Sequence, residues 1–136
     1  EVLIQAFTCV AVADPIIWAG AKPVFVDVDD SLNIDFGLLE RHITSKTKAI
    51  IVQHTFGMPA NLKKITEIAQ KYNIRLIEDC AHSLGGQYQG KKLGLFGDAS
   101  FFSFGRDKVI SSVFGGMAII NSKFPSKKLR ASKVQS

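Results

Sequence analysis

The chain has 136 residues, of which 46% are hydrophobic and ten are phenylalanine, enough to bury the core of one domain. Its long apolar stretches, such as VAVADPIIWAGA, are interrupted by Asp14 and Pro15 and fall short of the roughly 20 residues that span a bilayer. The net charge of +5 comes from residues 122–136, which hold five basic side chains and no acidic one. A nucleic-acid-binding module is supported by this basic segment alone, without stacking aromatics beyond Phe124, so no nucleic-acid partner is expected.

Short runs of β-forming residues alternate with stretches of helical period. This alternation predicts an α/β fold, with a mostly parallel sheet and flanking helices. Strands are expected at residues 1–7, 22–29, 47–54, 74–79, 99–104 and 117–121, and helices at 8–19, 35–43 and 62–73. Thr8 and Asn61 are residue types that cap helix N-termini, and Gly20 can end the first helix. The glycine-rich stretch 80–98 predicts an irregular connection with at most one helical turn.

Residues just beyond the strand ends are the candidates for ligand binding, because ligands of open α/β sheets collect at the carboxyl ends of the strands. Asp79 ends an apolar strand, where a carboxylate must be paired, solvated or functional. Read alone, it is also a good N-cap for a short helix opening at Cys80. His82 would face the same side one helical turn later, where a lone histidine more often has a structural role. His54 ends another strand, where either a structural role or ligand contact is open.

The loop SFGRDKVISSVFGG follows a further strand and carries Ser103 and Lys108. A serine hydroxyl with neighbouring backbone N–H groups can hold a phosphate, and a desolvated lysine can form a Schiff base. The glycine pair at 115–116 would let the chain pass close to a ligand. An exposed turn lysine beside Arg106 and Asp107 is the simpler interpretation of this stretch taken alone.

Other site chemistries lack their motifs. The sequence contains no GxGxxG after a strand, no P-loop, no HExxH and no CxxC, so neither a nucleotide site of those types nor a metal site is expected. The two cysteines, Cys9 and Cys80, are far apart and have no metal-ligand or disulfide-framework spacing. This usage is typical of a reducing compartment, and a cytoplasmic location is expected.

Taken in order, the motifs resemble one family. VFVDVDDSLNID, HTFGMPANL, LIEDCAHSLGGQYQGKKLG, GDASFFSFGRDK and the glycine pair are similar to the PLP-dependent sugar aminotransferases of the DegT/StrS type, over residues 2–121. The resemblance implies the large domain of the fold type I aminotransferases and pyridoxal 5′-phosphate as cofactor. It also implies amino transfer, from an amino-acid donor such as glutamate, to a nucleotide-linked keto-sugar for polysaccharide, lipopolysaccharide or other amino-sugar synthesis. The members of this family act as homodimers.

The resemblance assigns a role to four residues. Lys108 would be the catalytic lysine that binds the cofactor as a Schiff base and shuttles the substrate proton. Asp79 would pair with the pyridinium nitrogen and keep it protonated. His82 would lie by the cofactor ring and its 3-hydroxyl, and Ser103 would hydrogen-bond the cofactor phosphate.

The sequence also departs from the family pattern. Val109 stands where Asn commonly follows the lysine, Phe114 stands where Glu precedes the glycine pair, and Cys9 takes the place of an aromatic that stacks on the ring. A non-catalytic member that binds PLP or a sugar nucleotide is therefore the alternative. Lys108 argues against the dehydratase branch of the family, which has a histidine there.

The length implies a part of a longer protein. Residues 1–121 resemble the central part of the PLP-binding large domain, and residues 122–136 would lead to a small domain absent from this chain. The upstream segment with the Gly-Thr phosphate-binding turn is absent as well. The isolated chain is therefore expected to be catalytically weak or inactive, and the parent protein active.

Overall fold

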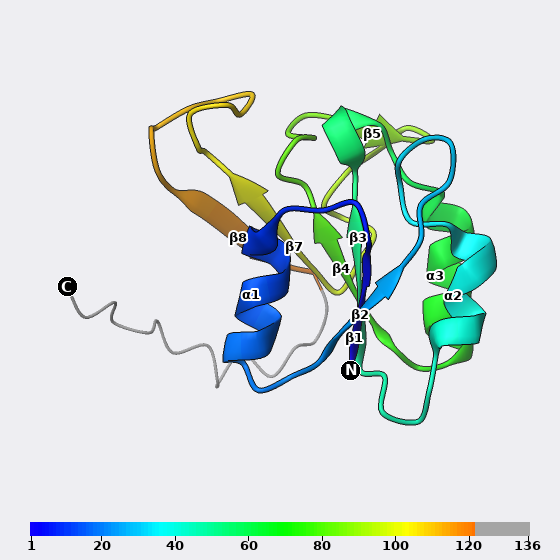
Figure 1. Ribbon diagram of the computed structural model, residues 1–136. Coiled ribbons are helices and arrows are strands. Elements are labelled where there is room, and N and C mark those ends of the chain that lie inside the picture. Colours follow the sequence, from blue (N-terminus) through cyan, green and yellow to red (C-terminus); the bar gives the residue numbers. More distant parts are fainter. Residues whose placement is uncertain (122–136) are drawn as a thin grey trace.

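Six strands form one sheet in the order β2-β1-β3-β4-β7-β8 in the computed structural model, which describes residues 1–121 (Figure 1). The first five strands run parallel, and β8 pairs antiparallel with β7. This confirms the predicted mostly parallel α/β fold. The strands are β1 (Val2–Gln5), β2 (Pro23–Val26), β3 (Ala49–Gln53), β4 (Arg75–Asp79), β7 (Ala99–Ser103) and β8 (Gly116–Ile120).

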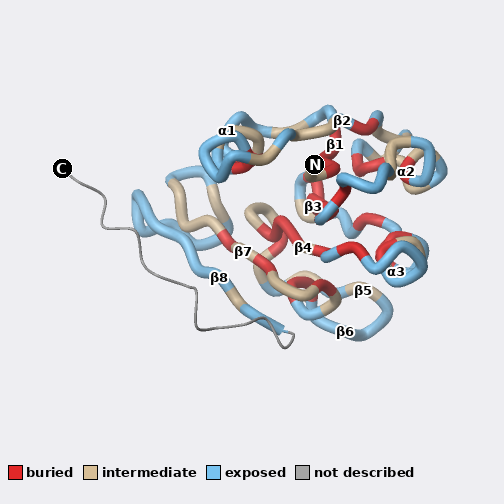
Figure 2. The backbone as a smooth tube through the Cα atoms, turned by 90° about the horizontal axis from the view of Figure 1, so that it is seen from below, coloured by how far each residue is buried: buried red, intermediate tan, exposed pale blue. Residues whose placement is uncertain are grey.

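Helices cover the two faces of the sheet unequally. α2 (Phe36–His42) and α3 (Leu62–Lys71) lie on one face and α1 (Val10–Trp18) on the other (Figure 1). Strand β3 is buried along its whole length, as expected for an apolar central strand covered on both sides. Figure 2 shows the buried backbone gathered in the central strands, while β8 at the edge is mostly exposed. The core therefore lies between the central strands and the α2–α3 layer.

Successive residues of each strand point to opposite faces and build two clusters. The larger cluster, on the α2–α3 side, includes Leu3, Ile50, Val52, Leu76 and Phe102 from the strands, with Leu39, Leu62 and Ile65 from the helices. The smaller one joins Ile4 and Ile51 to Val12 and Ile16 of α1. The sheet is thus apolar on both faces, and the polar groups of its strands gather at the strand ends.

The predicted helix caps have different outcomes. The Asn61 side chain accepts a hydrogen bond from the Lys64 N–H at 3.3 Å, so this N-cap is confirmed. The Thr8 cap is wrong: Cys9 occupies the cap position of α1 without a side-chain bond, and the Thr8 hydroxyl instead donates to Gln53 Oε1 at 2.7 Å. Thr8 therefore joins β1 to β3 at their carboxyl ends.

Residues 80–98 contain turns and a small hairpin, β5 (Gln87–Tyr88) with β6 (Lys91–Lys92), and no helix, which agrees with the expected irregular connection of at most one helical turn. The short helix expected at Cys80 is therefore absent, and the N-cap interpretation of Asp79 is wrong. The sequence suggested that the glycine pair at 115–116 passes close to a ligand, but the structure gives another reason for glycine at 116. A Cβ on Gly116 would lie 2.6 Å from the Phe102 carbonyl oxygen, so the residue is small to let β8 approach β7.

Three remaining observations bear on the sequence predictions. Among the described residues, no helix is long and apolar enough to cross a membrane. Cys9 is exposed and Cys80 buried, and both are free thiols. The basic segment 122–136 lies outside the described residues.

The Asn61 cap gives a test of the local fold. Replacing Asn61 by Ala leaves the N–H of Lys64 without its side-chain acceptor and should lower the free energy of unfolding by about 1 kcal/mol in urea denaturation. Asn61→Ser retains a capping oxygen and should lose at most a few tenths of a kcal/mol. Equal losses in the two variants would contradict the capping role.

Candidate active site

The carboxyl ends of β4 and β7 bring together two segments that lie far apart in the sequence. The two strands are paired in parallel register, with Asp79 beside Phe101. The turn after β4 carries His82, and the loop after β7 carries Lys108. Lys108 Nζ lies 2.9 Å from His82 Nε2 and 3.0 Å from Asp107 Oδ2. The lysine side chain is only 15% exposed, so the simple expectation of a solvated turn lysine is wrong.

The contact between Lys108 and His82 fixes the tautomer of the imidazole. A lysine ammonium only donates hydrogen bonds, so His82 Nε2 accepts and the ring proton resides on Nδ1. His82 Nδ1 is buried and has no hydrogen-bond partner among the described residues. A buried N–H without an acceptor costs stability, and an oxygen atom of a bound ligand would satisfy it.

Asp79 lies at the end of β4 and is buried. Burial raises the pKa of its carboxyl above the usual value, while the hydrogen bond from the Ala81 N–H and the nearby His82, His54 and Lys108 act in the opposite direction. Its Oδ1 accepts from the Ala81 N–H at 2.9 Å. A cation placed against this carboxyl would favour its charged form, so Asp79 is suited to hold a protonated ring nitrogen.

Ser103 ends β7 and begins the loop that carries Lys108, residues 103–116, which we call the lysine loop. Its Oγ accepts from the Gly105 N–H at 3.3 Å, and the described residues offer no acceptor for its own proton. A Cβ at Gly105 would lie 3.5 Å from Ser103 Oγ and 3.8 Å from Lys108 Cγ. The loop therefore turns close to both side chains, and the serine hydroxyl has a donor left for an anionic oxygen.

A hollow of about 360 Å³ opens in front of the lysine. It is lined by Phe56, His82, Asp107, Lys108 and Val109. The hydrogen bond from Lys108 lowers the pKa of the Asp107 carboxyl, which lies at the exposed rim. An amine, an imidazole and an aromatic ring thus face one space, a combination typical of small-molecule sites.

The carboxylate of Glu78, the residue before Asp79 in β4, is completely buried. It accepts hydrogen bonds from four N–H groups: those of Gly94 (2.8 Å), Phe96 (2.6 Å) and Gly97 (2.7 Å), and His54 Nε2 (3.3 Å). Burial alone would raise the pKa of Glu78, but the His54 bond and the three backbone donors outweigh it, so the pKa is lowered. The glycine-rich loop is thereby fixed to β4.

His54 has a structural role in this network. Its Nδ1 accepts from the Ala60 N–H at 3.2 Å, so the ring proton resides on Nε2 and is donated to Glu78. The imidazole is therefore neutral and fully hydrogen-bonded. Of the two interpretations that the sequence left open, the geometry favours the structural one.

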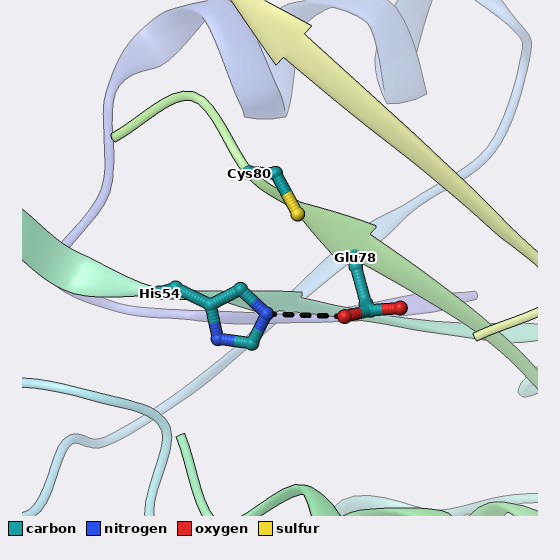
Figure 3. A group of neighbouring side chains, drawn as sticks. All are labelled: His54, Glu78 and Cys80. Atoms are coloured by element: carbon teal, nitrogen blue, oxygen red, sulfur yellow. Dashed lines mark hydrogen bonds and ion pairs between the residues drawn. The ribbon is translucent and has the colours of Figure 1, made fainter. Parts of the chain in front are cut away.

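Three potential metal ligands lie with their ligand atoms within 4.8 Å of one another: His54, Glu78 and Cys80 (Figure 3). Their hydrogen bonds argue against a metal ion, because both His54 nitrogens and both Glu78 oxygens already have partners. Burial also raises the pKa of the Cys80 thiol to about 12, which opposes the thiolate form that binds metals. We interpret the group as a hydrogen-bonded support that fixes the glycine-rich loop to β4.

The structure thus brings Lys108 and His82 into contact, and it places Asp79 and Ser103 at the ends of adjacent strands. Sequence reasoning missed Phe56 and the support by Glu78. The adjacency of Glu78 to Asp79 is a signal that could have been used, because alternate strand residues point to opposite faces. No comparable signal marks Phe56.

Comparison with known proteins gives consistent matches. The model of the DegT/DnrJ/EryC1/StrS aminotransferase family matches residues 1–136. GDP-perosamine synthase of Escherichia coli O157:H7 is 41% identical over 124 residues, which are 90% of this chain and 34% of that protein. UDP-N-acetyl-3-dehydro-alpha-D-glucosamine 3-aminotransferase of Acidithiobacillus ferrooxidans is 42% identical over 132 residues, 96% of this chain and 36% of that protein.

Solved structures agree with these relatives. Helicobacter pylori PseC, an aminotransferase involved in the biosynthesis of pseudoaminic acid, superposes with a TM-score of 0.87 at 32% identity. The match covers 90% of this chain and 33% of that one. The chain therefore spans about a third of the length of the proteins it matches.

The Glu78 network gives a test with a definite pH dependence. Glu78→Gln should lower the free energy of unfolding by at least about 2 kcal/mol at pH 7, because an amide cannot accept four N–H groups. The pKa of Glu78 is lower in the folded protein than its ordinary 4.5, so its contribution is complete above that value. The difference from wild type should shrink as the pH falls below about 4.5.

Urea denaturation at several pH values measures this difference. Glu67→Gln is the matched control, since Glu67 is exposed on α3 and, among the described residues, is paired with Lys64 alone. It should change the free energy of unfolding by less than about 0.5 kcal/mol. A Glu78→Gln loss that is independent of pH would show that the carboxylate charge is not what stabilises the loop.

Proposed function

The chain belongs to the DegT/DnrJ/EryC1/StrS aminotransferase family, and from this membership we propose that the protein transfers an amino group to a nucleotide-linked keto-sugar with pyridoxal 5′-phosphate as cofactor. The observation that carries the proposal is the contact of Lys108 Nζ with His82 Nε2 at 2.9 Å, beside Asp79. The relatives named above, a perosamine synthase and a UDP-sugar aminotransferase, support the nucleotide-linked sugar. The family and α/β fold expected from the sequence are confirmed.

The described residues fit this cofactor. Lys108 supplies the amine that would hold it covalently, and Asp79 supplies a buried carboxyl for a protonated ring nitrogen. The Nδ1–H of His82, which has no partner among the described residues, would donate a hydrogen bond to the hydroxyl of the cofactor ring. Ser103 Oγ would donate to the cofactor phosphate. When bound, the cofactor provides an electron sink for the carbon that loses or gains a proton.

Lys108 and His82 then have complementary roles in our proposal. Lys108 Nζ, once released from the cofactor, would take and return the substrate proton, because it is the amine that faces the hollow. His82 Nε2 accepts from this amine and orients it. Asp79 would act through charge, since a carboxylate against the ring nitrogen keeps that nitrogen protonated.

We extend the proposal to glutamate as amino donor, to a cytoplasmic location, to homodimers and to synthesis of amino sugars for surface polysaccharides. The free thiols of Cys9 and Cys80 support a reducing compartment. Exposed apolar side chains, Val10 and Trp18 of α1 and Phe114 of the lysine loop, support contact with a second copy. Val109 lines the hollow, so this departure from the family pattern lies beside Lys108 in the candidate site.

Absorbance spectroscopy of the full-length protein tests the role of Lys108. Added PLP should give a visible band at about 410–430 nm that disappears when glutamate is added. Lys108→Ala should lose the band and reduce amino transfer by at least about 10³-fold. Lys127→Ala, in the basic segment, is the control and should keep both. A wild type whose band no amino acid bleaches would favour the non-catalytic alternative.

The charge of Asp79 is tested by Asp79→Asn, which preserves the shape of the side chain. The amide cannot hold a protonated ring nitrogen, so the rate of the glutamate half-reaction should fall by roughly 10²-fold or more. The variant should still show the visible band, because Lys108 remains. Stopped-flow absorbance with saturating glutamate measures the rate, and an unchanged rate would exclude the proposed role of Asp79.

A further inference from the structure

Phe56 has an unusual position for a large apolar residue. Its side chain is 69% exposed, and its backbone has φ 51°, in the left-handed region that non-glycine residues rarely adopt. The segment is firmly held: the Thr55 N–H donates to Asn33 Oδ1 at 2.9 Å, and the Met58 N–H donates to the Thr55 carbonyl at 2.9 Å. Strained conformations that the surroundings enforce are concentrated at functional sites.

The loop brings the Phe56 ring to the proposed catalytic residues. The ring stacks on His82, with centroids 5.9 Å apart and planes at 17°. Phe7 also contacts the Phe56 ring, edge-on, with centroids 6.2 Å apart. Gly57 allows this approach, because a Cβ there would lie 3.1 Å from the His82 carbonyl oxygen. The rings of Phe7, Phe56 and His82 therefore form a continuous surface that begins at the hydrogen-bond partner of Lys108.

We propose that Phe56 is a specificity-determining residue whose ring packs against the apolar C–H face of the sugar of the nucleotide-linked substrate. This inference rests on the proposed function. Phe56 lines the hollow together with Lys108, so a ring that rests on it lies near the reacting amine. The reacting sugar must approach that amine, whereas the base is separated from the sugar by two phosphates.

The chemistry of the Phe56 ring favours contact with a sugar ring over contact with the diphosphate. A phenyl face offers no hydrogen-bond donor and cannot replace the hydration of a phosphate. It can bury the apolar face of a hexose, whose hydroxyl groups remain free for polar partners at the ring edge. Asp107 borders the same hollow and supplies a carboxylate that can accept from such a hydroxyl group.

Calorimetric binding to the full-length protein with PLP bound tests the inference. The probes are GDP-mannose against GDP, and UDP-N-acetylglucosamine against UDP. Phe56→Gly should raise the Kd of the sugar-bearing member of a pair about tenfold and leave the Kd of the bare nucleotide within about twofold. Phe56→Tyr, which keeps the ring, should retain the wild-type preference.

The Phe56→Gly substitution also distinguishes an effect on binding from an effect on stability. Because glycine adopts φ 51° without strain, Phe56→Gly should change the melting temperature by no more than a few degrees. Phe25→Ala is the matched control: Phe25 is about half exposed on β2 and should leave all four affinities unchanged.

The outcomes distinguish this inference from the function on which it rests. Suppose that the wild type binds the probes. If Phe56→Gly then binds both members of each pair as the wild type does, or loses affinity for both equally, the role of Phe56 is overturned and the proposed function is not. A wild type that binds neither pair would overturn the proposed nucleotide-sugar function and this inference with it. Selective loss of the sugar-bearing probes supports both.

Discussion

The buried carboxylate of Glu78 is the interaction on which the candidate site depends. Placing a charge in the interior costs several kcal/mol unless hydrogen bonds compensate, and four N–H groups do so here. The donors come from the end of β3 and from the glycine-rich loop between β4 and β7. One carboxylate therefore joins β4 to the residue that follows β3 and to the loop that leads into β7.

The neighbouring carboxyl of Asp79 has the opposite environment because a strand alternates its side chains. Glu78 points to the α2–α3 side with Leu76 and Cys80, whereas Asp79 points to the other face with Ile77. Glu78 is saturated with donors and its pKa is lowered; Asp79 has one backbone donor and its pKa is raised. The first carboxylate is thus committed to structure, and the second retains capacity for a cationic ligand.

Much of this arrangement could be predicted from the sequence. Alternating apolar runs predicted the parallel strands, and the rule that ligands collect at strand ends gave a wider set of candidates, His54 among them. The family resemblance then assigned roles to Asp79, His82, Ser103 and Lys108 within that set. Their closeness follows from the pairing of β4 with β7, which sequence reasoning did not state. Helix capping was predictable at Asn61, where the signal is local, but not at Thr8. There a long-range bond to Gln53 competes for the hydroxyl.

The remaining features depend on interactions that a linear sequence does not display. His54 could be assigned to structure only once Glu78, 24 residues later, was seen to accept its proton. Phe56 has a left-handed backbone without the glycine or asparagine that usually announces one, because the loop is held by Asn33 and by the close approach of Gly57 to the His82 carbonyl. Local propensity predicts the elements of this fold, whereas the conformation of Phe56, beside His82, is enforced against propensity by long-range contacts. The failure of local rules at this edge is therefore itself an argument that the edge is functional.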